Sequence, residues 1–138
     1  METAITDAAD QLLIQCRAKG WTVSTAESCT GGMVAAALTE IAGSSDVMDR
    51  GFVTYTNKSK HQMVGVPMAL FETVGAVSKE VARAMAEGAR THAGVDLACG
   101  ITGVAGPGGG SDAKPVGLVH IAAASPTRTI HERCMFDG

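Results

Sequence analysis

The sequence has 138 residues, the length of one domain, and its 46% of hydrophobic and 18% of charged residues exclude a disordered chain. No stretch reaches the roughly 18 uncharged apolar residues of a membrane span, and the N-terminus has no basic region before an apolar run, so we expect no signal peptide and a cytoplasmic protein. A net charge of −3 and an aromatic content of 4% argue against a general polyanion binder and a base-stacking nucleic-acid platform, while leaving room for a local basic site.

Helical and strand patterns alternate along the chain. Apolar residues at helical spacing predict a helix over 7–19 that stops at Gly20, and β-branched residues predict a strand over 21–26. Further patterns predict helices over 30–41, 57–63 and 78–92, and Asn57 is the expected cap of the helix over 57–63. Strands are predicted over 50–55, 97–102, 116–124 and 129–136. This order predicts an α/β layered domain over residues 1–138, with a mostly parallel central sheet and an antiparallel hairpin at one side.

The cysteines and histidines show no metal-binding pattern. The four cysteines contain no CxxC pair, so we expect reduced, mostly buried thiols and no structural zinc: Cys16, Cys29, Cys99 and Cys134. The four histidines are scattered, and we expect each at the surface or in the core rather than as a ligand.

A first unusual loop, AESCTGG at residues 26–32, joins a predicted strand to a predicted helix. This position is that of a nucleophile elbow for Ser28, with the amides of Gly31 and Gly32 as possible oxyanion donors. The alternative is an ordinary helix cap, with glycines that permit tight packing of the helix on the sheet. Cys29 is a rival nucleophile, although a buried thiol beside the serine fits better.

A second unusual loop follows the strand at 97–102 and holds six glycines within residues 100–110. Such a loop can form a nest of N–H groups for a phosphate, and Lys114 beyond it could add charge. It is neither a Walker loop nor a GxGxxG turn. The alternative is a flexible lid or a hairpin turn.

A third group of polar residues lies where the strand at 50–55 leads into a helix. Lys60 can act as base to a serine if desolvation or nearby positive charge lowers its pKa, and Tyr55 could relay a proton or orient the lysine. The alternative is that Lys58 and Lys60 form a solvated helix face.

Four stretches together resemble the CinA C-terminal domain family. They are AESCTGG at 26–32, GFVTYTN at 51–57 with Lys60, GAVS at 75–78, and GITGVAGP at 100–107 with KPVG at 114–117. The match runs in the family's order from about residue 8 to the end of the chain.

The resemblance implies a three-layer α/β/α fold and membership of a family that includes nicotinamide-nucleotide amidases. These bacterial salvage enzymes convert nicotinamide mononucleotide to nicotinate mononucleotide and ammonia without metal or cofactor. The resemblance also implies that Ser28 is the nucleophile, that Lys60 is its base and that the Tyr55 hydroxyl assists. We expect the substrate to be bound by Thr30, Gly31, Gly32, Asn57, Thr102, Gly103 and Gly106, with Thr102 and Gly103 in the cradle for the ribose phosphate.

The chain departs from the family in two ways. Relatives commonly continue with a basic helix after the segment that matches residues 136–138, so a truncated chain would leave one face of the sheet uncovered and lack a phosphate-contacting arginine. Some relatives carry a large N-terminal domain, and this chain resembles the stand-alone type.

Two other functions stay open at this point. One is a non-catalytic nucleotide- or phosphate-binding module, and the other is a partner-binding domain in a competence or DNA-damage response. The acidic charge gives no support for direct DNA binding. We expect a dimer or a higher homo-oligomer, because a small sheet domain with alanine-rich helices often buries one face against a copy.

Overall fold

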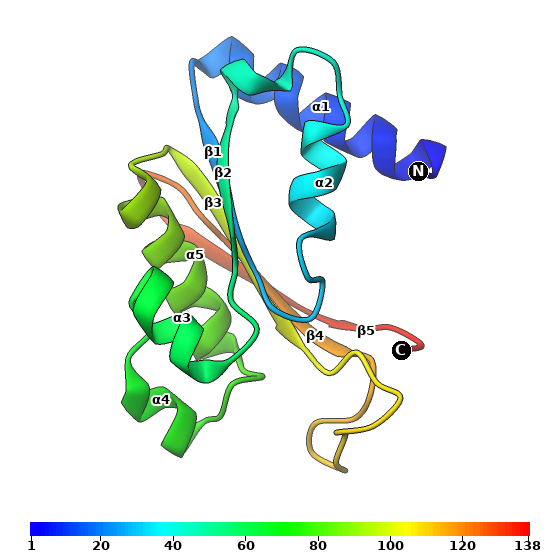
Figure 1. Cartoon of the computed structure of the whole chain (residues 1–138), viewed down its shortest axis with the longest axis vertical. Helices are drawn as coiled ribbons and strands as arrows, with labels where there is room; N and C mark the ends of the chain where they lie inside the picture. Colours follow the sequence, from blue (N-terminus) through cyan, green and yellow to red (C-terminus); the bar gives the residue numbers. More distant parts are fainter.

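Five strands form one sheet at the centre of the computed structural model, which describes residues 1–138 (Figure 1). The strands are β1 (Val23–Glu27), β2 (Met48–Val53), β3 (Leu97–Gly103), β4 (Leu118–Ala124) and β5 (Thr129–Met135). Their spatial order is β2-β1-β3-β4-β5. Strand β1 pairs in parallel with β2 and β3, whereas β4 pairs antiparallel with β3 and β5. The predicted α/β sheet with an antiparallel hairpin at one side is confirmed.

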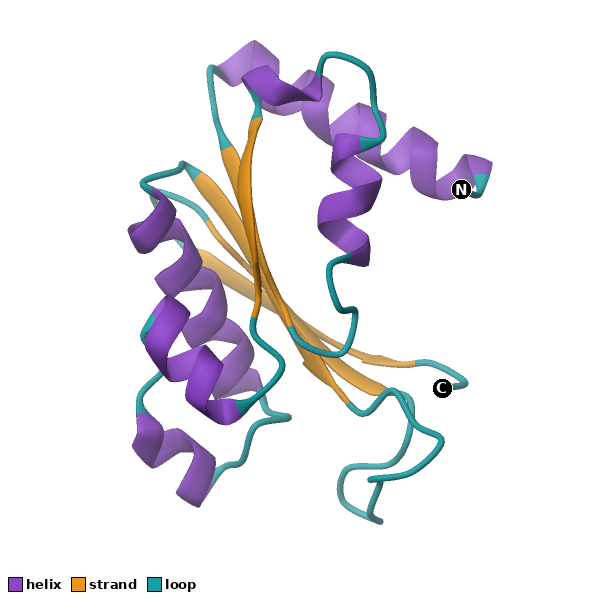
Figure 2. Cartoon of the chain, viewed as in Figure 1, coloured by secondary structure: helices purple, strands orange, loops and turns teal.

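Helices cover both faces of this sheet (Figure 2). One layer holds α1 (Thr3–Lys19) and α2 (Met33–Thr39), and the other holds α3 (Asn57–Val64), α4 (Met68–Thr73) and α5 (Lys79–Ala93). A short 3-10 turn, η1 (Ser44–Asp46), precedes β2. The three-layer α/β/α arrangement is confirmed. None of these helices combines the length and the apolar character needed to cross a membrane.

Three local features differ from the sequence-based expectations. Helix α4 was not predicted. Thr56, rather than Asn57, caps α3, because the hydroxyl of Thr56 accepts a hydrogen bond from the amide of Ser59 at 3.0 Å. Helix α2 begins at Met33 instead of residue 30. Gly31 and Gly32 have left-handed φ values of 58° and 105°, which do not fit a right-handed helix, so the helix begins after them.

The core between α5 and the sheet depends on small residues. Ala82 and Ala86 of α5 pack against Ala122 and Ala124 of β4, and all four are buried. A Cβ atom added at Gly100 would lie 2.3 Å from the carbonyl oxygen of Ala82. Glycine and alanine therefore let α5 approach β3 and β4 closely, and this contact fixes α5 beside the carboxyl end of β3.

The opposite core packs α1 and α2 against β1 and β2. Leu13 of α1 is fully buried together with Val23 and Val47. These two helices leave part of β4 and β5 uncovered, and an apolar groove of about 360 Å³ lies there. Val119 and Ile121 of β4 line this groove together with Met33 of α2.

The four cysteines are free, and only Cys16 is buried, so the expectation of mostly buried thiols was wrong for the other three. Burial nevertheless raises the pKa of the Cys99 thiol to about 12. No group of three or more His, Cys, Asp or Glu side chains is placed to hold a metal ion.

Candidate active site

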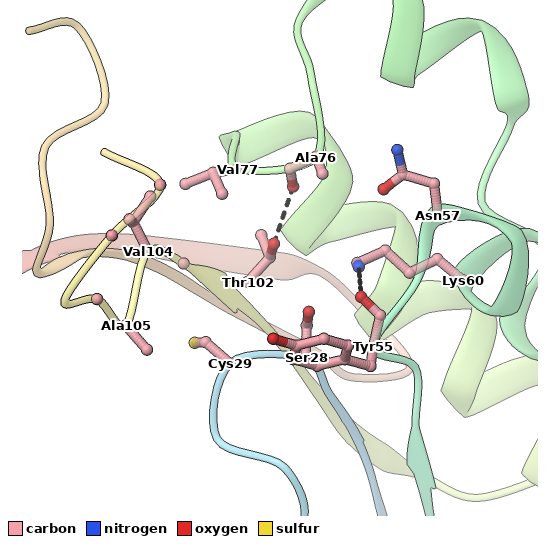
Figure 3. A pocket seen from close by; sticks show the side chains of 14 residues that line it. Ser28, Cys29, Tyr55, Asn57, Lys60, Ala76, Val77, Thr102, Val104 and Ala105 are labelled. Atoms are coloured by element: carbon pink, nitrogen blue, oxygen red, sulfur yellow. Dashed lines mark hydrogen bonds between the residues drawn. The ribbon is translucent and has the colours of Figure 1, made fainter. Parts of the chain in front are cut away.

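A cavity of about 410 Å³ opens where the carboxyl ends of β1, β2 and β3 meet (Figure 3). Ligands of open α/β sheets bind at this edge, because loops from neighbouring parallel strands converge there. The cavity is lined by Ser28, Cys29, Tyr55, Asn57, Lys60, Ala76, Val77, Thr102, Gly103, Val104, Ala105, Gly106, Gly108 and Gly109. Its volume is typical of sites for small molecules.

Ser28 follows directly after β1 and is 8% exposed. Its amide donates a hydrogen bond to the carbonyl oxygen of Ile101 at 3.0 Å, which extends the pairing of β1 with β3 by one residue. The sheet therefore fixes the backbone of Ser28, and its side chain lines the cavity.

Glu27, the last residue of β1, organises the turn that follows Ser28. Its buried carboxylate accepts hydrogen bonds from the Thr30 hydroxyl at 2.6 Å and from the amides of Val34 and Ala35 at 2.9 and 3.0 Å. A carboxylate at a helix N-terminus is stabilised by the helix dipole and by the free amides there. This role was not predicted. The signal in the sequence is an acidic residue at the end of a strand that is otherwise uncharged and is buried along its whole length. It stands seven residues before Val34, whose amide donates to its carboxylate.

Lys60 lies in α3 and is 2% exposed. Its Nζ donates a hydrogen bond to the backbone carbonyl oxygen of Tyr55 at 3.1 Å, and no carboxylate lies within ion-pair distance. Burial lowers the pKa of Lys60, because the ammonium ion loses water without gaining a negative partner, and the nearby Cys29 acts weakly in the opposite direction. The condition for Lys60 to act as a base, desolvation, is therefore met, whereas Lys58 is exposed and fits the alternative of a solvated helix face.

Tyr55 and Asn57 lie at the rim of the cavity, in the segment between β2 and α3. Tyr55 is 76% exposed, which is unusual for a large aromatic side chain. Its ring can therefore contact a molecule that enters the cavity.

Thr102 and the glycine-rich loop form the opposite wall. The Thr102 hydroxyl, buried at the end of β3, donates to the carbonyl oxygen of Ala76 at 2.9 Å and so ties β3 to the segment before α5. A Cβ atom added at Gly103 would lie 2.7 Å from the carbonyl oxygen of Leu118, and one at Gly106 would lie 2.5 Å from Cγ1 of Val116. Glycine at these positions lets the loop fold back closely onto the start of β4.

Lys114 does not line this cavity. Its Nζ donates a hydrogen bond of 2.5 Å to the carbonyl oxygen of Val74, the residue that ends α4. The expectation that Lys114 adds charge to the phosphate cradle was therefore wrong. The lysine instead anchors the far end of the glycine-rich loop to the segment that leads into α5.

The structure brings together most, but not all, of the predicted site residues. Ser28, Lys60, Tyr55, Asn57, Thr102, Gly103 and Gly106 line one cavity. Thr30, Gly31 and Gly32 do not line it, since the Thr30 hydroxyl is turned toward Glu27.

One of the two expected oxyanion donors is already in use, because the Gly31 amide donates to the carbonyl oxygen of Ser28 at 3.1 Å. The amides of Gly32 and Cys29 donate to no backbone carbonyl, and of these two residues only Cys29 lines the cavity. The Cys29 thiol is a poor rival to Ser28, because burial raises its pKa and disfavours the thiolate.

Comparisons with known proteins agree with the fold. The model of the CinA C-terminal domain family matches residues 5–138. The chain is 50% identical over 123 residues to the nicotinamide-nucleotide amidohydrolase PncC of Enterobacter agglomerans, covering 88% of this chain and 75% of that protein. It is 54% identical over 120 residues to a CinA-like protein of Anaeromyxobacter dehalogenans, covering 87% of this chain but 29% of that protein.

Similar solved structures include that of the competence/damage inducible protein CihA from Agrobacterium tumefaciens, which matches this fold with a TM-score of 0.96. The two chains are 48% identical, and the match covers 99% of this chain and 83% of that one. A CinA superfamily protein from Escherichia coli has a TM-score of 0.93 and 34% identity over 100% of this chain and 81% of that one. Among curated proteins, the chain spans only 29–30% of the first CinA-like relatives.

Proposed function

The chain belongs to the CinA C-terminal domain family, and on this premise we propose that it hydrolyses nicotinamide mononucleotide to nicotinate mononucleotide and ammonia. The relative named as a nicotinamide-nucleotide amidohydrolase, 50% identical to this chain, supports the reaction class. The observation that carries the proposal is that Lys60, buried without a carboxylate partner, opens onto the same cavity as Ser28.

In the first half of the proposed reaction, the Ser28 Oγ attacks the carboxamide carbon. The neutral amine of Lys60 takes the hydroxyl proton, since its lowered pKa makes the neutral form accessible. The negative charge that develops on the carboxamide oxygen lies beside the free amide of Cys29, the residue after the nucleophile. This amide replaces those of Gly31 and Gly32 as the proposed oxyanion donor.

Collapse of the tetrahedral intermediate breaks the carbon–nitrogen bond. The Lys60 ammonium returns its proton to the departing nitrogen, with the Tyr55 hydroxyl assisting, so that ammonia leaves and an ester on Ser28 remains. A water molecule, deprotonated by Lys60, then attacks the ester carbon. Cleavage of the ester bond returns a proton to Ser28 and releases nicotinate mononucleotide.

The rest of the cavity suits the ribose phosphate of the substrate. Backbone amides of a glycine-rich turn can surround a phosphate closely, because no Cβ atom blocks the approach. Gly103 and Gly106 provide such backbone beside the Thr102 hydroxyl, and the Asn57 amide lies across the opening. We assign the phosphate to this wall and the carboxamide to the side of Ser28 and Lys60.

Ammonia release from nicotinamide mononucleotide tests the proposal, with Lys60→Met and Lys58→Met compared with the unaltered chain. Lys58 is exposed and lies two residues earlier in α3, so its variant controls for loss of a lysine from this helix. We expect Lys60→Met to lose at least about a hundredfold in kcat and Lys58→Met to retain it. Calorimetry with the same nucleotide tests the alternative function. If the unaltered chain binds the nucleotide without any turnover, a non-catalytic nucleotide-binding module is favoured.

A further inference from the structure

Basic side chains gather in one place outside the candidate active site. Four of the 11 lysines and arginines and two of the 4 histidines surround the first turns of α5, the hairpin β4–β5 and the end of the glycine-rich loop. They are Lys79, Arg83, Lys114, His120, His131 and Arg133. A cavity of about 320 Å³ lies among them, lined by Lys79, Lys114, His120 and Arg133.

The histidines in this cluster form a pair on the α5 side of the hairpin. His120 lies directly opposite Arg133 in the β4–β5 register, and His131 lies opposite Ala122. The Nδ1 of His120 and the Nε2 of His131 are 2.8 Å apart, and His120 is only 9% exposed. A hydrogen bond between two ring nitrogens requires one of them to lack a proton, so at least one imidazole of the pair is neutral.

No lysine or arginine of this cluster has a carboxylate partner at ion-pair distance. The ion pairs of the protein are Arg17 with Asp46 and Arg50 with Asp49, and neither involves the cluster. Glu80 is the one carboxylate that lines the cavity.

The basic side chains of this cluster also influence the two histidines. Burial lowers the pKa of both imidazoles, and the neighbouring cations lower each pKa further: Arg133 and Lys114 act on His120, and Lys79 and Arg83 on His131. Glu80 and Glu132 act in the opposite direction without reversing the shift. In a chain of net charge −3, this local excess of basic side chains around one cavity favours an anionic ligand.

We propose that this cavity binds a small molecule carrying a phosphate group, held between the side chains of Lys79, Arg133 and His120. The amides of Lys79 and Glu80 at the start of the 15-residue α5 donate to no carbonyl and add to the attraction. The volume admits a phosphate with a small organic group, and the overall negative charge of the chain disfavours a nucleic-acid polymer.

This proposed phosphate site lies next to the candidate active site. Val77 lines both cavities, and Lys114, which lines this one, also holds the glycine-rich loop to Val74. A phosphate bound here therefore contacts the segment that separates the two cavities. The inference does not depend on the proposed amidase reaction, since every residue that carries it lies outside the catalytic group.

Histidine side-chain NMR of the full chain tests the proposal, with inorganic phosphate titrated at constant ionic strength. We expect the resonances of His120 and His131 to move and their pKa values to rise by about half a unit, because a bound dianion stabilises the imidazolium form. The resonances of His61 and His92, which lie outside the cluster, should stay in place. Absence of a shift at millimolar phosphate, or an equal shift with chloride, would overturn the proposal.

A pair of double variants supplies the matched control. Lys79→Gln with Arg133→Gln should weaken the phosphate response about tenfold, whereas Lys58→Gln with Arg128→Gln removes the same charge elsewhere and should not. All four residues are exposed, so neither variant disturbs the core. Equal weakening by both would show a diffuse charge effect and contradict the site. Tighter binding of adenosine monophosphate than of phosphate would identify a phosphate ester as the ligand, and equal binding would identify the free ion.

Discussion

The Nζ of Lys60 lies 3.1 Å from the backbone carbonyl oxygen of Tyr55, and this is the one hydrogen bond that the buried lysine makes. A carbonyl oxygen is a neutral acceptor, so it offsets only a small part of the cost of burying an ammonium ion. Burial therefore lowers the pKa of Lys60 and makes its neutral amine more accessible, in a fixed position beside the cavity that Ser28 lines.

The rate of amide hydrolysis should depend on pH through Lys60. Because the neutral amine acts as base, kcat/KM should rise with pH as Lys60 loses its proton, with a midpoint below the ordinary lysine pKa of 10.5. Ammonia release measured from neutral to alkaline pH gives this profile, and Lys58→Met should leave it unchanged. A midpoint at or above the ordinary value would contradict the role of burial.

Glu27→Gln should weaken both the fold and the activity. The buried carboxylate accepts three hydrogen bonds, and the amide that replaces it turns an NH2 group toward N–H donors of α2. We expect a loss of about 2–3 kcal/mol in the free energy of unfolding, measured by urea denaturation, and a lower kcat. Thr30→Val removes only the hydroxyl bond and should cost about 1 kcal/mol. Similar stability of Glu27→Gln and the unaltered chain would contradict this role.

Glycine is required where α5 crosses β3. A Cβ atom at Gly100 would lie 2.3 Å from the oxygen of Ala82 and 2.6 Å from the nitrogen of Ala86, and these backbone atoms cannot move without displacing the helix. Gly100→Ala should therefore lose about 3 kcal/mol or fail to fold. Gly108→Ala meets no atom within 4 Å and should stay within about 0.5 kcal/mol in a thermal unfolding experiment.

Lys114→Met should loosen the glycine-rich loop without touching the reacting atoms. Loss of the hydrogen bond to Val74 removes about 1 kcal/mol of loop ordering, so KM for nicotinamide mononucleotide should rise about fivefold while kcat changes little. The kinetics are measured in phosphate-free buffer, and Lys114→Arg should restore part of the affinity. A fall in kcat at unchanged KM would show that Lys114 acts on the chemical step instead.

Sequence patterns predicted the local structure well where one element alone decides it. The helix α5 and the strand β3 were both evident from neighbouring residues. The grouping of Ser28, Lys60 and Thr102 around one cavity was also expected from their places in the chain. Ser28 follows β1, Thr102 lies near the end of β3, and Lys60 lies in the helix after β2.

Contacts between distant parts of the chain were not predictable from the same patterns. Thr30 was expected at the substrate, but the carboxylate of Glu27 competes for its hydroxyl and turns it away. Lys114 was expected at the phosphate cradle of the candidate active site, but it lies outside that cavity and binds a carbonyl 40 residues away in sequence. In both cases a partner that spacing alone does not reveal satisfies the polar group.

Ammonia release by Ser28→Ala and Cys29→Ala, measured side by side with the unaltered chain, is the decisive test of Ser28 as the nucleophile. Both substitutions remove one small polar atom from the same turn, so they disturb the cavity to a similar extent. We expect turnover of nicotinamide mononucleotide by the unaltered chain and by Cys29→Ala, and none by Ser28→Ala, which should still fold. Normal ammonia release by Ser28→Ala would contradict the serine mechanism.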